Sequence, residues 1–334
     1  MNPDRRQLLK LAGLLAAAMA ANRGFAMDAP PRSDSAGAKA RGGDFNVHSL
    51  TGSSNFKAIY GDPRLKAEFL LFLTNVFHVF PEQPLHRLIE EAATSGKTDR
   101  EIYALVQSRL PGIKPFLAEV RYALPALSKQ KDEMVAQTLD LLGARRSING
   151  YLEIGTTGRY AGRLKSQLEI KGDLVLLHDN APGYSPTDIV ERGGISKLGR
   201  FVSMNDYAPV PSSEVPDRSL DVIANYIGFH HAPLPKLDPF VASLQRMLRP
   251  GGRMIVRDHD VHSPAMNRMV ALAHDVFNMG LGTAWQVNQA ELRHFTSLEQ
   301  LLAYLEARGF RNDGRKLLQK GDPTQNALMV FVRV

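Results

Sequence analysis

Five short apolar runs, separated by helical segments and glycine turns, occupy the sequence from residue 150 onward. Strands that alternate with helices in this way favour a parallel sheet covered by helices. The last stretch, residues 315–318 and 326–334, is predicted to form a closing hairpin. The five predicted strands are Leu152–Ile154, Asp173–Leu177, Arg200–Ser203, Leu220–Ala224 and Gly252–Val256.

Polar side chains stand at the carboxyl ends of these strands. In an open parallel sheet, ligands bind beyond the carboxyl ends of the strands. We therefore expect one crevice to receive Glu153, Asp179, Asp206 and the group Asp258–Asp260. The general polarity of loops explains part of this pattern, but it explains less well an acidic residue at four strand ends.

The first strand leads into a glycine turn. Gly155 and Gly158 let the backbone approach a ligand closely, and a helix beginning near Tyr160 would offer unpaired N–H groups. Glu153 would place a carboxylate at the strand tip, where a ligand cation or hydroxyl could meet it. Such turns are also common without a ligand, so this turn gains its weight from the strand ends around it.

Residues 150–334 resemble a class I S-adenosylmethionine-dependent methyltransferase of the broad type 11 kind. The resemblance is carried by Glu153–Gly158, by Pro216–His231 and above all by Leu248–Val256, which is similar to the family's turn and fifth strand. It implies an α/β fold with a Rossmann-like, doubly wound, seven-stranded sheet whose last strand is reversed. It also implies S-adenosylmethionine as cofactor, contacted by Glu153, Gly155, Thr157 and Gly158 at the methionine end, Asp179 at the ribose hydroxyls, Asn205 and Asp206 beside the adenine, and Asn225 after the fourth strand.

The function that the resemblance implies is methyl transfer to a small-molecule acceptor. Thr156 and Thr157 stand where the family's first motif commonly carries a further glycine, and β-branched residues disfavour positive φ. The alternative is therefore a non-catalytic, methyltransferase-like protein that binds a ligand in the periplasm. A nucleic-acid partner is not expected, because the formal charge of +7 is a mild bias for 334 residues and no Asn-Pro-Pro-Tyr-like motif follows the fourth strand.

Candidate catalytic side chains follow the fourth and fifth strands. Methyl transfer from a sulfonium needs a base only where the nucleophile must lose a proton. His231, Asp258 and His259 are predicted to act as a base or as polar contacts to the acceptor. The sequence from Asp258 to His262, Asp-His-Asp-x-His, is also a plausible set of metal ligands, and hydrogen bonding that only stabilises the fold is a third interpretation. No metal is assigned.

The N-terminal residues resemble a twin-arginine signal peptide over positions 1–26. Arg5 and Arg6 precede a short apolar run, Leu11–Ala21, and small residues follow it. The run is shorter than the roughly 20 residues of a spanning helix, so we expect no stable membrane span after cleavage. The alternatives are an uncleaved anchor and a terminus that is basic and apolar by chance. The implied partner is the twin-arginine translocase and the implied location is the periplasm, with residues 27–46 as a disordered linker.

Residues 47–149 are predicted to form a helical covering segment ahead of the methyltransferase-like domain. Asp62 and Pro63 begin a helix expected to reach about Phe80, and Thr98 opens another with a capping box. A later segment, Ser263–Phe295, is expected to form a substrate lid together with these helices, or else to pack against the sheet edge. The chain contains no cysteine, which excludes disulfides and cysteine–zinc sites.

Overall fold

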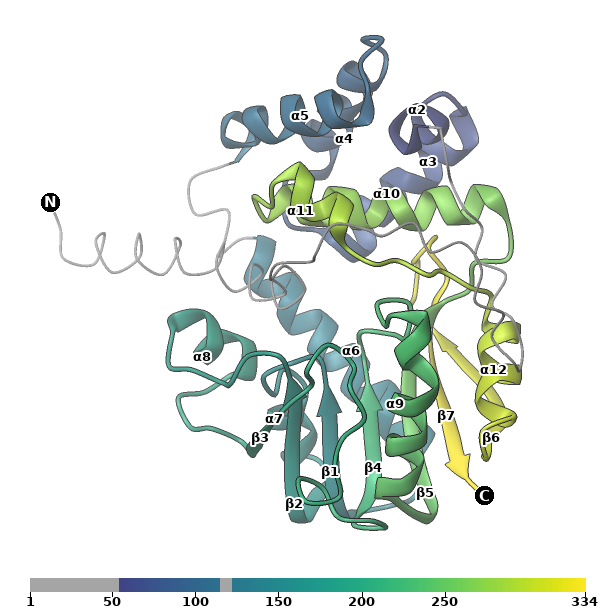
Figure 1. Ribbon diagram of the computed structural model, residues 1–334. Helices are drawn as coiled ribbons and strands as arrows, with labels where there is room; N and C mark the ends of the chain where they lie inside the picture. The colour runs from purple at the N-terminus through teal and green to yellow at the C-terminus, as the bar shows by residue number, and fades with distance from the viewer. Residues whose placement is uncertain (1–53, 115–121) are drawn as a thin grey trace, which may run out of the picture.

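The computed structural model describes residues 54–114 and 122–334, so the predicted signal peptide (1–26) and linker (27–46) lie outside the described residues. The described residues form a seven-stranded sheet in the order β3-β2-β1-β4-β5-β7-β6, with β7 antiparallel to β5 and β6 (Figure 1). The predicted doubly wound α/β fold with a reversed last strand is therefore confirmed. The strands are β1 (Ser147–Ile154), β2 (Glu169–His178), β3 (Arg200–Ser203), β4 (Leu220–Asn225), β5 (Leu248–His259), β6 (Phe310–Leu318) and β7 (Asn326–Arg333).

Several strands extend beyond the apolar runs that predicted them. β1 begins at Ser147 rather than Leu152. Its first residues escaped the prediction because Ser147 and Asn149 are exposed and only Ile148 between them is buried, so they form no continuous apolar run. β6 begins at Phe310 rather than at Arg315, and most of its residues are exposed at the sheet edge. A continuous apolar run marks only the part of a strand that is covered on both faces, so the half-exposed parts escaped the prediction.

Helices cover both faces of the sheet. On one face, α9 (Leu234–Met247) and α12 (Leu298–Glu306) pack on residues of β1, β2 and β4, including Leu152 and Val175. On the other, α6 (Leu124–Leu142) and α7 (Ala161–Lys165) pack on residues such as Tyr151 and Val222. The helical segment predicted over residues 47–149 is thus divided, because its last helix, α6, belongs to the layers of the sheet. The short helix α8 (Pro186–Arg192) lies between β2 and β3 in the chain.

The remaining N-terminal helices form a separate helical layer, here called the cap. It contains α2 (Asn55–Tyr60), α3 (Pro63–Phe72), the π-helical turn η2 (Leu73–Phe77), α4 (Glu82–Ala93) and α5 (Asp99–Ile113), together with α10 (Pro264–Gly280) and α11 (Trp285–Ala290). Leu272 and Val276 of α10 share one apolar core with Phe69 and Ile102 of the N-terminal helices. Figure 1 shows α10 and α11 between these helices and the sheet. None of the helices in the described ranges is long and apolar enough to cross a membrane.

Local capping explains where the cap helices begin. The Asp62 carboxylate accepts hydrogen bonds from the backbone of Arg64 and Leu65, and Thr98 forms the predicted capping box with Glu101. The helix expected to run from Pro63 to Phe80 is shorter than predicted. Its α-helical part ends at Phe72, and the π turn that follows ends at Phe77, directly before His78, whose φ of 38° is left-handed.

Candidate active site

The carboxyl ends of the central strands face the cap across a cavity of about 210 Å³. Strand register sets this edge, because Ile154 of β1 pairs with Leu177 of β2 and with Asn225 of β4, and Asn225 pairs with Val256 of β5. Aromatic rings of the cap, among them Phe77 and Phe277, line the apolar side of the cavity. The polar side includes Arg159, His230, His231, His259, His274 and Glu291.

The predicted glycine turn lies at the end of β1 and is packed tightly. Gly155 has a φ of 75°, and a Cβ atom built there would lie 2.2 Å from Cδ1 of Ile227, in the turn after β4. The Gly155 N–H donates to the Leu177 carbonyl at 2.8 Å. Gly158 has a φ of 99°, so both glycines adopt a backbone conformation that residues with a side chain rarely take.

Glu153 braces this turn from within. Its carboxylate is fully buried and accepts hydrogen bonds from the Tyr151 hydroxyl at 3.0 Å, the Tyr160 N–H at 3.2 Å and the Thr156 hydroxyl. Burial raises the pKa of Glu153, against which these donors act. The carboxylate thus contacts the turn itself rather than projecting toward a ligand as the sequence suggested.

Thr156 completes the turn. Its Oγ1 accepts from the N–H groups of Gly158 and Arg159, both at 3.1 Å, while its hydroxyl donates to Glu153. The side chain therefore occupies two backbone donors of the turn that precedes α7, a role that the sequence did not reveal. Thr157 is also buried, at 8% exposure.

The predicted ribose and adenine residues meet at the ends of β2 and β3. Asp179 is half-buried and accepts a hydrogen bond from the Asp206 N–H at 3.3 Å. Asp206 also pairs with Lys236 of α9 at 2.5 Å. Asn205 is exposed, and both Asn205 and Asp206 have positive φ, at 46° and 52°.

Asn225 lies at the end of β4 with no exposed surface. Its Oδ1 accepts from the Ile227 N–H at 3.3 Å, and its Nδ2 has no hydrogen-bond partner within the described ranges. A buried amide without a partner costs free energy unless a ligand or water completes it. A ligand atom or a water that accepts a hydrogen bond from Asn225 Nδ2 would therefore remove this cost.

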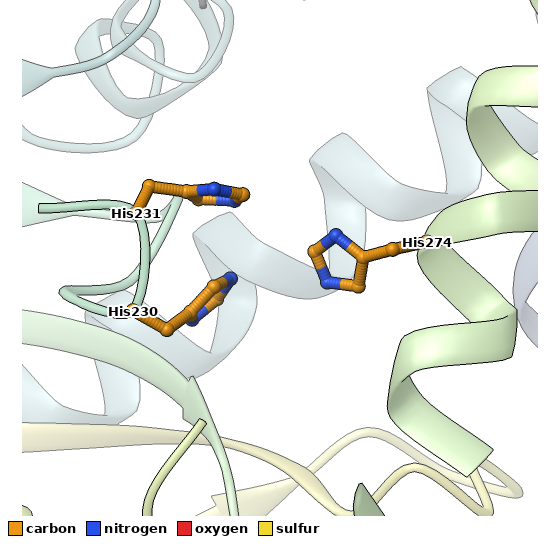
Figure 2. Close-up of side chains that lie close together, drawn as sticks. All are labelled: His230, His231 and His274. Atoms are coloured by element: carbon orange, nitrogen blue, oxygen red, sulfur yellow. The ribbon is translucent and has the colours of Figure 1, made fainter. Parts of the chain in front are cut away.

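Four of the ten histidines in the sequence gather on the cavity wall: His230, His231, His259 and His274. His230 and His231 follow β4, and their ring centroids lie 4.2 Å apart. His274 approaches them from α10, with centroids 5.4 Å from His230 and 5.5 Å from His231 (Figure 2). The predicted lid segment thus contributes a histidine that the sequence reasoning missed, because nothing in the pattern of α10 distinguishes His274 from a packed helix residue.

Asp258 holds His230 in place. Its Oδ1 accepts from His230 Nδ1 at 2.6 Å, and its Oδ2 accepts from the Phe229 N–H at 2.9 Å. Burial raises the pKa of Asp258, but His230 and its other donors lower it overall. Asp258 is therefore an ionised, buried carboxylate that acts on the cavity through His230.

The predicted catalytic histidines differ in their surroundings. Burial lowers the pKa values of His231 and His259, each to about 3, and lowers that of His274 as well. These three rings are neutral near pH 7. His259 has both nitrogens engaged, Nδ1 with the Thr324 carbonyl at 3.1 Å and Nε2 with Asn326 at 3.4 Å, so it is fixed as part of the wall.

The structure does not assemble the metal set considered from the sequence over Asp258–His262. Asp260 caps α12 by accepting from the Leu298 N–H at 3.0 Å, and His262 is exposed and contacts the Asp260 carbonyl. Alternating residues of an extended segment point in opposite directions, which separates these side chains. In the described part of the chain, the metal-type group that does form is His230, His231 and His274.

Two buried ion pairs border the cavity, and the sequence did not indicate either. Arg159 makes two hydrogen bonds to Glu191, at 2.7 and 2.6 Å. Glu291 pairs with Arg293 at 2.7 Å and lies 3.5 Å from His231 Nδ1. Burial raises the pKa of Glu291, but Arg293 lowers it overall. Only the tertiary fold could show these partners. Arg159 and Glu191 come from separate parts of the chain, and Glu291 and Arg293 lie in a loop that has no recognisable motif.

No protein-family model matches the sequence, and no curated protein is similar to it. Solved structures do share similarity. An O-methyltransferase family 2 protein from Planctomyces limnophilus in complex with apigenin is 14% identical, with 98% of this chain and 95% of that chain covered and a TM-score of 0.45. The carbon methyltransferase CurJ is 17% identical over 81% of this chain and 70% of its own, with a TM-score of 0.45.

A third structure is the 1,6-didemethyltoxoflavin-N1-methyltransferase of Burkholderia thailandensis, with 1,6-didemethyltoxoflavin and S-adenosylhomocysteine bound. It is 15% identical, with 70% of this chain and 89% of that chain covered and a TM-score of 0.40. All three TM-scores are below 0.5, so the site is argued from the residues of this chain alone.

Proposed function

We propose that this protein transfers a methyl group from S-adenosylmethionine to a small-molecule acceptor bound in the cavity beneath the cap. The observation that carries the proposal is the row of side chains at the carboxyl edge of the sheet, which ends at a cavity lined by neutral imidazoles. Ligands of open α/β sheets bind at this edge. The volume of about 210 Å³ suits a small acceptor rather than a polymer.

The residues at this edge fit the cofactor. Gly155 and Gly158 keep side chains out of the turn, Asp179 presents a half-buried carboxylate suited to ribose hydroxyls, and Asn225 has a buried Nδ2 without a partner in the described ranges. S-adenosylmethionine would supply an electrophilic methyl group at the cavity. Asn205 and Asp206 would lie beside the adenine.

The chain's own contribution to the reaction would be to orient the acceptor. Displacement of a methyl group requires the acceptor atom to be held in line with the methyl carbon and the sulfur. Such positioning can lower the activation barrier by several kcal/mol. His231 is neutral and lines the cavity, so its Nε2 lone pair could accept a hydrogen bond from an acceptor O–H or N–H and orient it for attack, whereas burial lowers the pKa of His231 to about 3 and makes full proton transfer to it unfavourable. Asp258 would act as a positioning residue through His230, and His259 would hold the wall.

Isothermal titration of the full chain with S-adenosylmethionine and S-adenosylhomocysteine tests this proposal. We expect both to bind, and Asp179→Ala to weaken binding roughly 10- to 100-fold, because hydrogen bonds to a charged group are lost. Asp140→Ala is the matched control, since Asp140 is an exposed carboxylate on α6, outside the row of strand-end residues. Absence of binding to the unmodified chain would reject the methyltransferase function.

A non-catalytic binding protein is the second candidate, and Thr156 favours it. Its Oγ1 already occupies the N–H groups of Gly158 and Arg159, so the turn has fewer donors with which to hold a cofactor in the alignment that methyl transfer needs. Incubation with methyl-labelled S-adenosylmethionine and a small-molecule extract separates the two candidates. Label in an acceptor supports the enzyme, whereas tight binding with no transferred label supports the binding protein.

Export by the twin-arginine route is proposed from the sequence of residues 1–26 alone. Replacement of Arg5 and Arg6 by lysine should retain the protein in the cytoplasm if the pair is a translocation signal. Cell fractionation of the wild-type and double-lysine chains measures this directly. An identical distribution of both chains would reject the signal.

A further inference from the structure

Three histidines place ring nitrogens close together in the cavity. One nitrogen from each of His230, His231 and His274 lies within 4.8 Å of the other two. His230 and His231 come from the turn after β4, and His274 comes from the middle of α10 on the cap (Figure 2). The group therefore joins the sheet to the cap across the cavity.

His230 is oriented with its lone pair toward this group. Asp258 accepts from its Nδ1 at 2.6 Å, so Nδ1 carries the hydrogen and Nε2 the lone pair. The His230 side chain is 5% exposed, and its Nε2 is buried with no hydrogen-bond partner among the described residues. A carboxylate behind a histidine whose other nitrogen lacks a partner is the usual arrangement around a metal-binding imidazole.

His231 is fixed in a similar way. Its Nδ1 lies 3.1 Å from the Leu292 carbonyl, which can only accept, so this nitrogen also carries the hydrogen. The lone pair of His231 is then on Nε2. His274 faces both rings from the opposite wall, and no carboxylate belongs to the three-residue group itself.

We propose that His230, His231 and His274 bind one divalent transition-metal ion of the zinc type. Three imidazoles suit zinc, cobalt and copper, whereas magnesium and calcium prefer oxygen ligands. Tetrahedral zinc at about 2.0–2.1 Å from each nitrogen brings the nitrogens to roughly 3.4 Å from one another, so modest rotation of the rings closes the group. The fourth position faces the cavity and is available to water or to an oxygen or nitrogen atom of a ligand.

This site stands apart from the proposed methyl transfer, because the metal would bind without S-adenosylmethionine. Only its role in acceptor choice rests on the proposed function: the ion would select acceptors that can ligate it, such as small molecules with a hydroxyl or carboxylate group, and coordination would then replace the direct contact of His231 with the acceptor. A bound metal lowers the pKa of such a hydroxyl and would hold it in the cavity. It would also tie α10 to the turn after β4.

The test uses the full chain, stripped with a chelator and then titrated with Zn²⁺, Co²⁺ or Mg²⁺. We expect one Zn²⁺ or Co²⁺ ion per chain, visible absorption bands of four-coordinate Co²⁺, and no competition from Mg²⁺. His274→Ala should weaken binding at least tenfold and remove the Co²⁺ bands. His262→Ala is the matched control, because His262 is exposed and outside the group, and it should bind as the wild type does.

Metal content that stays below one ion per chain, or Co²⁺ bands that survive His274→Ala, would overturn the proposal. Should that variant unfold, X-ray absorption of the zinc-loaded wild-type chain decides, since three imidazole ligands support the site and fewer than three reject it. The titrations contain no S-adenosylmethionine. A chain that binds Zn²⁺ but not the cofactor supports the metal site and rejects the proposed function. A chain that binds the cofactor but not Zn²⁺ rejects the metal site and leaves the proposed function standing.

Discussion

The glycine turn after β1 should tolerate no side chain at position 155. In Gly155→Ala, the new Cβ would have to keep a φ near 75° and would lie 2.2 Å from Cδ1 and 2.8 Å from Cγ1 of Ile227. Two separate costs follow, one from the backbone conformation and one from the clash. The variant therefore measures how closely the turns after β1 and β4 approach each other.

The two costs can be estimated and separated. A left-handed conformation costs a residue with a side chain about 1–2 kcal/mol, and an overpacked contact costs about 1–3 kcal/mol, so Gly155→Ala should lose roughly 2–5 kcal/mol of unfolding free energy. Gly193→Ala is the matched control. Gly193 has a φ of 77° but no atom within 4 Å of the added Cβ, so only the backbone cost of about 1–2 kcal/mol remains.

Urea unfolding followed by far-UV circular dichroism gives these free energies, provided the m-value is unchanged. The double variant Gly155→Ala with Ile227→Ala should lose about 1–3 kcal/mol less than the sum of the two single variants, because the clash is gone. Equal losses for Gly155→Ala and Gly193→Ala would refute the close approach. Strict additivity in the double variant would show that Ile227 is not the obstacle.

Three further predictions concern buried polar groups near the turn. Glu191→Leu leaves the Arg159 charge buried without its carboxylate and should cost about 3–5 kcal/mol in urea unfolding, whereas a loss under 1 kcal/mol would contradict a tight pair. Thr156→Val keeps the shape but removes the hydroxyl, and its loss of about 1–3 kcal/mol should show in the same assay. Burial lowers the pKa of Lys131 to about 8, so between pH 8 and roughly 10.4 the unfolded chain binds more protons than the folded one. The free energy of unfolding contributed by Lys131 should therefore rise with pH across that window, and Lys131→Met should abolish the rise in urea titrations at successive pH values.

The fold and the edge that carries the site could be predicted from the sequence because both depend on local order. Apolar runs that alternate with helices specify a parallel sheet, and a parallel sheet gathers all its carboxyl ends at one edge. The sequence alone therefore placed Asp179, Asp206 and Asn225 along that edge. The same local logic identified Thr98 as a helix cap.

The roles of the individual side chains at this edge were decided only by the tertiary structure. Burial and hydrogen-bond direction determine what a side chain does, and both depend on residues far away in the chain. Glu153 was expected to face a ligand, but it accepts three hydrogen bonds from its own strand and turn. His259 was expected in a catalytic role, yet Thr324 and Asn326 engage both of its nitrogens.

The histidine group shows the same division. His230 and His231 are adjacent in the sequence and follow a strand, so their presence at the edge could be foreseen. His274 lies on an amphipathic helix whose pattern indicates only packing. Cap packing brings that helix across the cavity, and Asp258 turns the ring of His230 toward it.

The sequence thus determined the sheet and the row of polar residues at its edge, because these follow from periodicity along the chain. The tertiary structure decided which of those residues face the cavity and which imidazoles meet there, because side-chain direction and burial arise only when distant segments pack together.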